Sequence, residues 1–173
     1  VDILYCHRFD PDTPLEETLR AFDDLIRQGK VLYAGISEWT AAQIEQAMRV
    51  SDRFLLNRIV VNQPRYNMLY RRIEDEVIPV SERNGIGQVV FSPLAQGVLT
   101  GKYKSVDAIP ADSRAANSRM NAFIKRELNA DALKRVARLS EIAGELGIPL
   151  ARMALAWILR LDSVASALVG ASK

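Results

Sequence analysis

The chain repeats one pattern of apolar and polar positions. A short apolar run is followed by a polar loop, then by a segment with apolar residues at helical spacing, and then by another apolar run. The runs are rich enough in apolar side chains to form buried strands. They predict five strands, at Ile3–Cys6, Val31–Ile36, Ile59–Asn62, Ile86–Phe91 and Val164–Val169.

The segments between the runs predict helices. Two of these helices are expected to begin with a capping box, formed by Thr13 with Glu16 and by Thr40 with Gln43. Proline at position 14 suits the first turn of a helix, and Gly29 is a typical stop. The predicted helices span about 14–28, 41–48, 71–83, 131–146 and 149–160, and residues 92–128 are expected to form a long loop.

Strands that alternate with helices predict parallel βαβ units, so we expect an α/β fold. Right-handed crossovers would place the helices on one outer side of the sheet. The periodicity leaves open whether the sheet is doubly wound or an arc of a closed barrel. No G-x-G-x-x-G motif follows the first strand, which disfavours a Rossmann-type dinucleotide fold.

Side chains that could bind a ligand or take part in catalysis stand at the carboxyl ends of four predicted strands. In a parallel barrel the active site lies at these strand ends. His7, the one histidine, could hydrogen-bond a carbonyl oxygen during reduction of its carbon. Ser37 and Gln63 could hold a carboxamide, and Phe91 could stack on a flat heteroaromatic ring. Taken singly, each residue also fits an ordinary role in a turn, a loop or the core.

The segment Phe91–Tyr103 is the most informative stretch of the sequence. Its two glycines permit close backbone approach and left-handed backbone, while Ser92 and Lys102 offer a hydroxyl and a cation. That combination is typical of a pyrophosphate site, although a surface loop with a solvated lysine has the same composition. Arg114 could add a planar cation for a further phosphate.

Composition narrows the class of protein. The 173 residues are 49% hydrophobic and 25% charged, enough for one domain with a core. The net charge is +2 with mixed signs, so we expect no nucleic-acid partner. One cysteine suits a reducing compartment, so we expect a cytoplasmic protein. No apolar run reaches the roughly 18 residues of a membrane span. The chain opens with Asp2 and a short apolar stretch, so we expect no signal peptide. Both ends of the chain are expected to be truncated.

Five segments, taken together and in order, resemble the aldo-keto reductase superfamily. They are Asp2–Arg8 (similar to its fourth strand), Gly35–Trp39 (its G-x-S motif), Gln63 with Tyr66-Asn67 (its sixth strand), Phe91–Tyr103 (its S-P-L-x-x-G-x-L-x-G-K-Y loop) and Gly170–Ser172 (its eighth strand). The chain most resembles the branch of bacterial reductases and potassium-channel β subunits. The resemblance implies a (β/α)8 TIM barrel, of which residues 1–173 would be a single partial domain with about five strands, similar to strands 4–8.

The resemblance also implies a role for each matching residue. His7 would be catalytic, because it would orient the substrate carbonyl and stabilise the charge that develops on it. Ser37 and Gln63 would hold a nicotinamide carboxamide, and Phe91 would stack on the nicotinamide ring. The cofactor phosphates would be lined by Ser92, Pro93, Leu94, Gln96, Gly97 and Lys102, with Arg114 near the adenosine and Gly170 and Ser172 near a 2′-phosphate. The hydroxyl and cations there favour NADP over NAD.

The sequence departs from the family pattern in two ways. Glu38 stands where family members often have asparagine, and a carboxylate cannot donate to the nicotinamide carbonyl, so we expect it to point elsewhere. The strands that carry the family's catalytic tyrosine, aspartate and lysine have no counterpart in these 173 residues. The tyrosines that are present stand in other contexts, at Tyr5, Tyr33, Tyr66, Tyr70 and Tyr103.

These matches predict NADP(H)-dependent reduction of aldehydes or ketones in the complete protein, and negligible activity in this chain alone. Two alternatives stay open: an NADP(H)-binding regulatory or redox-sensing subunit, and a degenerate scaffold without a cofactor. The expected partner is a small-molecule carbonyl substrate. An arc of five strands leaves two unpaired edges, so we expect either a longer natural gene product or association through those edges into a homo-oligomer.

Overall fold

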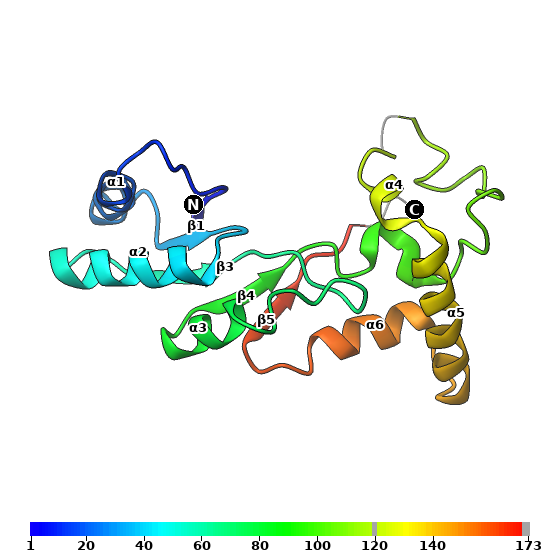
Figure 1. Cartoon of the computed structure of the whole chain (residues 1–173). Helices are drawn as coiled ribbons and strands as arrows, with labels where there is room; N and C mark the ends of the chain where they lie inside the picture. The colour runs from blue at the N-terminus through cyan, green and yellow to red at the C-terminus, as the bar shows by residue number, and fades with distance from the viewer. Residues whose placement is uncertain (119–120, 171–173) are drawn as a thin grey trace. The chain divides into compact units, whose positions relative to one another are not determined.

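The computed structural model describes residues 1–118 and 121–170, and strands and helices alternate along it (Figure 1). The strands are β1 (Ile3–Cys6), β2 (Tyr33–Ile36), β3 (Ile59–Asn62), β4 (Gly87–Val90) and β5 (Val164–Ala167). The helices are α1 (Leu15–Arg27), α2 (Ala41–Phe54), α3 (Val77–Arg83), the 3₁₀ helix η1 (Ala95–Thr100), α4 (Ile124–Glu127), α5 (Ala130–Glu145) and α6 (Leu150–Ile158). Each predicted strand is present, so the α/β prediction is confirmed.

The five strands form one sheet whose spatial order is the order of the sequence, β1-β2-β3-β4-β5. The pairs β1–β2, β2–β3 and β3–β4 are parallel, and Ile36 pairs with both Cys6 and Asn62. A doubly wound sheet reverses its strand order at a switch point, and this sheet does not. The topology is therefore that of a barrel arc, with the carboxyl ends of the parallel strands at one edge.

The residues group into two compact units. Unit 1 comprises residues 1–65, 72–91 and 162–166, and unit 2 the described residues of 66–71, 92–161 and 167–170. Each unit has an apolar core of its own. The core of unit 1 is built from Leu19, Ile36, Trp39, Ile44, Ala47, Met48, Leu56, Ile59, Val80 and Ile86. The core of unit 2 is built from Ala95, Val98, Leu99, Tyr103, Ile124, Val136, Ala143, Leu150, Met153 and Ala154.

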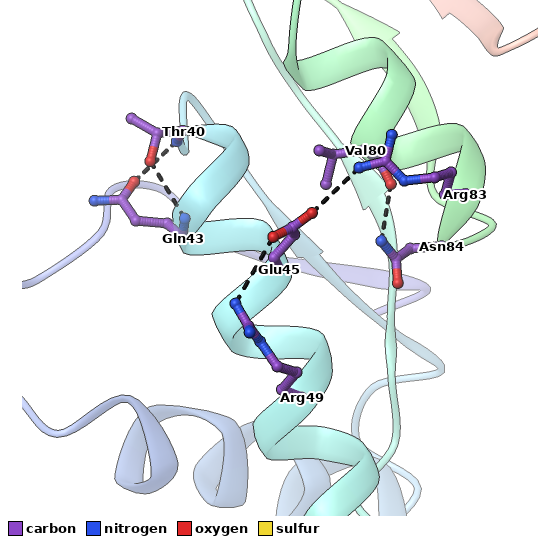
Figure 2. Close-up of polar contacts among 7 residues, drawn as sticks. All are labelled: Thr40, Gln43, Glu45, Arg49, Val80, Arg83 and Asn84. Atoms are coloured by element: carbon purple, nitrogen blue, oxygen red, sulfur yellow. Dashed lines mark hydrogen bonds and ion pairs between the residues drawn. The ribbon is translucent and has the colours of Figure 1, made fainter.

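Helix α2 begins with the predicted capping box (Figure 2). The Oγ1 atom of Thr40 accepts a hydrogen bond from the Gln43 backbone N–H at 3.3 Å, and Gln43 Oε1 accepts one from the Thr40 backbone N–H at 2.9 Å. Two backbone donors of the first turn are thereby satisfied, which contributes about 1 kcal/mol to helix stability. The expectation for Thr40 and Gln43 is confirmed.

Helix α1 begins without a side-chain cap, so the capping box predicted at Thr13 is wrong. The hydroxyl of Thr13 donates instead to Asp10 Oδ2 at 2.7 Å. Asp10 also accepts a hydrogen bond from the Asp12 backbone N–H at 3.0 Å. The physical reason is position: Pro14 has a non-helical ψ of 126° and is itself the N-cap, so the helix begins at Leu15 and Thr13 lies one residue before the capping position.

Helices α2 and α3 of unit 1 are joined at their surface by one carboxylate (Figure 2). Glu45 of α2 lies 3.2 Å from Arg83 of α3 and 3.7 Å from Arg49, four residues further along α2. All three side chains are exposed, so each pair contributes at most about 1 kcal/mol. The network orients α3 on α2, whereas the apolar core holds the two helices together.

Several elements differ from the predictions. Helix α2, expected to span 41–48, extends to Phe54. The helix expected from Arg71 begins only at Val77, because the preceding residues form turns in which Ile73 O accepts a hydrogen bond from the Ile78 backbone N–H at 2.8 Å. The long loop expected at 92–128 contains η1 and α4. Helices of four to six residues are too short to show a helical period in a sequence, and their apolar residues are ordered by the core of unit 2.

Candidate functional site

The carboxyl ends of β1 to β4 in unit 1 bring together four of the predicted residues, His7, Ser37, Gln63 and Phe91, here termed the strand-end cluster. Backbone hydrogen bonds hold three of them to the preceding strand or its following loop: Ser37 N to Cys6 O (3.1 Å), Gln63 N to Ile36 O (2.7 Å) and Phe91 N to Pro64 O (3.0 Å). The cluster is positioned by the parallel sheet itself, because each backbone is fixed by its neighbour.

Ser37 and Gln63 lie together as the sequence predicts. The buried hydroxyl of Ser37 donates to the backbone carbonyl of Gln63 at 2.8 Å. A guanidinium nitrogen of Arg8 lies 3.4 Å from the same hydroxyl oxygen. The Gln63 carboxamide makes no hydrogen bond to the described part of the chain, so its donor and acceptor are available to a ligand.

His7 and Phe91 complete the cluster. The side chain of His7 is exposed, and within the described residues its imidazole makes no hydrogen bond. Only the His7 backbone carbonyl is engaged, because it accepts from Arg8 Nη1 at 2.6 Å. Phe91 is half-buried, and its backbone bridges to Arg65. The His7 imidazole therefore does not hydrogen-bond its loop, and the Phe91 side chain is not fully buried in the core.

The Glu38 carboxylate is directed to the loop after β3. Its backbone has a φ of +59°, in the left-handed region that non-glycine residues rarely adopt. This conformation lets the carboxylate accept a hydrogen bond from the Arg65 backbone N–H at 2.6 Å. Glu38 thereby ties the loop after β2 to the loop after β3, beside Ser37 and Gln63.

Unit 2 contains a pocket of about 690 Å³, here termed the loop pocket. Eight of the predicted cofactor residues line it: Ser92, Pro93, Leu94, Gln96, Gly97, Lys102, Arg114 and Gly170. The predicted residue Ser172 lies outside the described residues. The pocket is also lined by three residues that no sequence signal indicated, Thr100, Asp112 and Asn117. Their position in the irregular segment 100–117 gave no periodic signal.

The backbone of the loop pocket is unusual. Ser92, Ala95 and Gln96 have φ values of +52°, +47° and +57°, and Gly97 has a φ of +100°. Non-glycine residues in this region each cost on the order of 1–3 kcal/mol, and such residues cluster at ligand sites. Successive residues that include left-handed backbone direct amide N–H groups to one side, which is how proteins form anion-binding concavities.

Side chains brace this backbone. Gln96 Nε2 donates to Ser92 Oγ at 2.6 Å, and Arg114 Nη1 donates to Gln96 Oε1. The fully buried Asn67 donates through Nδ2 to the Ser92 carbonyl at 2.9 Å, and its Oδ1 accepts from the Leu69 N–H at 3.0 Å. Asn67 was noted in the sequence only as part of a matching segment, and nothing in its neighbours indicates that it holds Ser92.

The charges of the loop pocket suit a phosphate. Neither Lys102 nor Arg114 has a carboxylate partner among the described residues, and Asp112 is the one acidic residue in the lining. Lys102 lies against Gly97, where an added Cβ would be 3.6 Å from Lys102 Cε. The buried hydroxyl of Ser113 has no hydrogen-bond partner. Two cations and the hydroxyls of the lining are donors that a pyrophosphate can use, so the residues fit a dinucleotide.

Other kinds of site find little support. The described residues contain no group of three or more His, Cys, Asp or Glu side chains that could hold a metal ion. Burial raises the pKa of the Cys6 thiol, which donates to the Arg8 carbonyl at 3.1 Å, so Cys6 is a poor nucleophile. Among the described helices, none has both the length and the hydrophobicity of a membrane span.

Comparison with known proteins gives consistent matches. The model of the aldo/keto reductase family matches residues 1–173. A probable voltage-gated potassium channel subunit beta of Arabidopsis thaliana is 46% identical over 174 residues, covering 100% of this chain and 53% of that protein. The putative subunit of this name in Schizosaccharomyces pombe is 39% identical over 176 residues, with 100% and 51% coverage. L-glyceraldehyde 3-phosphate reductase of Escherichia coli K12 is 36% identical over 176 residues, with 100% and 50% coverage. The chain thus spans about half the length of the curated relatives that it matches.

Proposed function

The chain belongs to the aldo/keto reductase family, and on that premise we propose that it is part of an NADP(H)-dependent oxidoreductase that reduces aldehydes or ketones. The five-stranded sheet is consistent with a partial (β/α)8 barrel of that family. The observation that carries the proposal is the loop pocket, where two cations without a carboxylate partner among the described residues, Lys102 and Arg114, lie beside a left-handed backbone.

Each set of residues has a part in the proposed binding. The loop pocket would hold the phosphates of NADP(H), with Lys102 and Arg114 supplying charge and Ser92 a hydroxyl. In the strand-end cluster, Ser37 and Gln63 would hold the nicotinamide carboxamide while Phe91 covers the ring. The bound dinucleotide would supply a hydride to the substrate carbon. His7 would donate a hydrogen bond to the substrate oxygen and hold it in position as negative charge develops there.

Titration of the chain with NADPH tests the proposal. We expect saturable enhancement or blue shift of NADPH fluorescence, and weaker binding of NADH, because NADH lacks the 2′-phosphate that the cations would contact. Absence of saturable NADPH binding at millimolar concentration would overturn the proposed function. Equal affinity for NADH would overturn only the assignment to NADP.

Reductase activity of the chain alone is expected to be negligible. A proton donor contributes roughly 10²–10⁴-fold to such a reaction, and no tyrosine of the chain stands in the context of the family's acid. Tyr66 and Tyr103 are almost fully buried, with 0% and 2% of their surface exposed. Robust NADPH-dependent reduction of 4-nitrobenzaldehyde by the purified chain would contradict this.

A second candidate function is an NADP(H)-binding regulatory subunit. It is favoured by the relatives whose names describe potassium channel β subunits. The exposed His7 favours the enzyme, because it retains the catalytic type of residue at that position. Joining the chain to the upstream strands of an aldo/keto reductase relative and measuring aldehyde reduction would separate the two. Turnover that falls on His7→Ala supports the enzyme, and tight NADPH binding without turnover supports the regulator.

A further inference from the structure

One arginine contacts two members of the strand-end cluster. Arg8 follows β1, and its Nη1 atom donates to the backbone carbonyl of His7 at 2.6 Å and lies 3.4 Å from Ser37 Oγ. The Cys6 thiol holds the Arg8 backbone, since Sγ donates to the Arg8 carbonyl at 3.1 Å. The guanidinium is thus fixed between the end of β1 and the end of β2, beside the place proposed for the nicotinamide.

The direction of the Ser37 hydrogen bonds follows from this arrangement. A hydroxyl has one proton, and that of Ser37 is donated to the Gln63 carbonyl at 2.8 Å. Arg8 has only donors, so Ser37 Oγ can only accept from it. Ser37 can therefore accept from the NH₂ group of a carboxamide but cannot donate to its oxygen. A carboxamide bound in this way lies next to a permanent positive charge.

The charge matters because the two redox forms of the cofactor differ there. The nicotinamide ring of NADP⁺ carries a positive charge, whereas that of NADPH is neutral. Resting on the proposed function, we propose that Arg8 is a specificity-determining residue that makes the chain bind NADPH more tightly than NADP⁺. Arg8 would thereby select the form of the cofactor that is ready to reduce a carbonyl group.

Other charged groups lie near the cluster, but among the described residues Arg8 is the one whose charged group contacts Ser37. The Glu38 carboxylate is directed to the Arg65 backbone N–H at 2.6 Å and makes no contact with Ser37. Asp10 is engaged by Thr13 and Asp12 in the loop after His7. Arg8 is thus the charge that touches Ser37, and Glu38 opposes it from further away.

The expected size follows from Coulomb's law. A unit charge roughly 8 Å from the ring, at an effective dielectric constant of about 40, changes the ratio of the two dissociation constants about fivefold. Part of this preference is screened by salt, because the Arg8 side chain is exposed. We therefore expect the preference to be larger at about 20 mM salt than at about 500 mM.

Isothermal titration of the purified chain with NADPH and with NADP⁺ tests the proposal. In Arg8→Gln, the ratio of the NADP⁺ to the NADPH dissociation constant is expected to fall about fivefold. Arg8→Lys keeps the charge and is expected to keep most of the preference. Arg49→Gln is the matched control, because Arg49 is 77% exposed on α2 and pairs only with Glu45; it should change neither constant.

The outcomes separate the two proposals. If the unaltered chain binds neither form, the proposed function fails and this inference fails with it. If both forms bind and Arg8→Gln weakens them equally, Arg8 only holds the cluster together and the specificity role is overturned. Should Arg8→Gln not fold, as judged by the emission of Trp39, Arg8→Met compared with Arg8→Lys decides: the ratio must fall in Arg8→Met and stay high in Arg8→Lys, and equal ratios in the two overturn the inference.

Discussion

Asp23 of α1 accepts two hydrogen bonds from Asn57, which lies 34 residues further along the chain. One comes from the Asn57 backbone N–H at 2.8 Å and the other from Asn57 Nδ2 at 2.7 Å. The carboxylate is 4% exposed, and Arg27 donates to its second oxygen at 2.5 Å. Asp23 therefore fixes the segment that enters β3 onto α1, within unit 1.

Removing this carboxylate should destabilise unit 1. Asp23→Ala is expected to lower the free energy of unfolding by about 2–3 kcal/mol, because both Asn57 donors lose a charged acceptor. Urea unfolding followed by the emission of Trp39, in a Trp157→Phe background, measures the loss. Asp24→Ala, one residue away and exposed, is the matched control and should change stability by less than about 0.5 kcal/mol. Equal effects of the two substitutions would contradict the role of Asp23.

The same carboxylate predicts a pH dependence. The hydrogen bonds from Asn57, followed by that from Arg27, hold the pKa of Asp23 below its usual range. A lowered folded-state pKa gives stability that is fully present above the unfolded-state pKa of about 3.9 and is lost as the pH falls through the folded value. The difference in stability between the unaltered chain and Asp23→Ala should therefore be constant near neutral pH and shrink below about pH 4. A difference independent of pH would rule out the ionised form as its source.

A glycine in β2 makes room for an aromatic ring. A Cβ atom at Gly35 would lie 2.7 Å from the Tyr5 ring and 2.9 Å from Val61 Cγ1. Gly35→Ala is therefore expected to cost about 1–3 kcal/mol, measured by the same unfolding experiment. Gly87→Ala in β4 is the matched control, since a Cβ there would have no neighbour closer than 4.0 Å. Combining Gly35→Ala with Tyr5→Ala should recover part of the loss; a loss that is undiminished would exclude the clash as its cause.

The lysine of the loop pocket should dominate phosphate binding. Lys102→Met is expected to weaken NADPH binding at least about tenfold, because it removes an unpaired cation from the pocket that would hold the phosphates. It should also reduce the dependence of affinity on salt. Lys104→Met, an exposed neighbour outside the pocket lining, is the control and should leave the affinity unchanged. If both variants bind NADPH equally well, the phosphates do not lie in this pocket.

Asn67 does not line the loop pocket, but its substitution is expected to lower the stability of unit 2 and the affinity for NADPH. Asn67→Ala removes the donor to the Ser92 carbonyl and the acceptor for the Leu69 N–H, at a fully buried position. We expect unit 2 to lose about 1–3 kcal/mol of stability, followed by the emission of Trp157 in a Trp39→Phe background. NADPH affinity should also fall, because Ser92 is no longer held in its left-handed conformation. Unchanged affinity would show that the loop keeps its conformation without Asn67.

Local signals in the sequence were sufficient to predict the strands and to predict which residues form part of the candidate site. The alternation of apolar runs and helical periods predicted each strand, and the Thr40–Gln43 capping box was predicted from its three-residue spacing. The loop Phe91–Tyr103 was predicted from its glycines and its lysine, and eight expected residues line one pocket. Such features depend on residues close in sequence, whose hydrogen bonds form within a single turn or loop.

Other relationships were decided only by the tertiary structure. Asp23 meets Asn57, Tyr5 covers Gly35, and Arg8 reaches Ser37, each across 29 to 34 residues of sequence. The sequence shows these side chains but not their partners, because the partners depend on the register of the parallel strands and on how the helices pack. The sequence alone therefore determined that the chain is an α/β protein, and it predicted which loop residues line one pocket. The packing decided that the Ser37 hydroxyl donates to the Gln63 carbonyl and lies 3.4 Å from the Arg8 guanidinium, because neighbouring strands of the sheet end side by side.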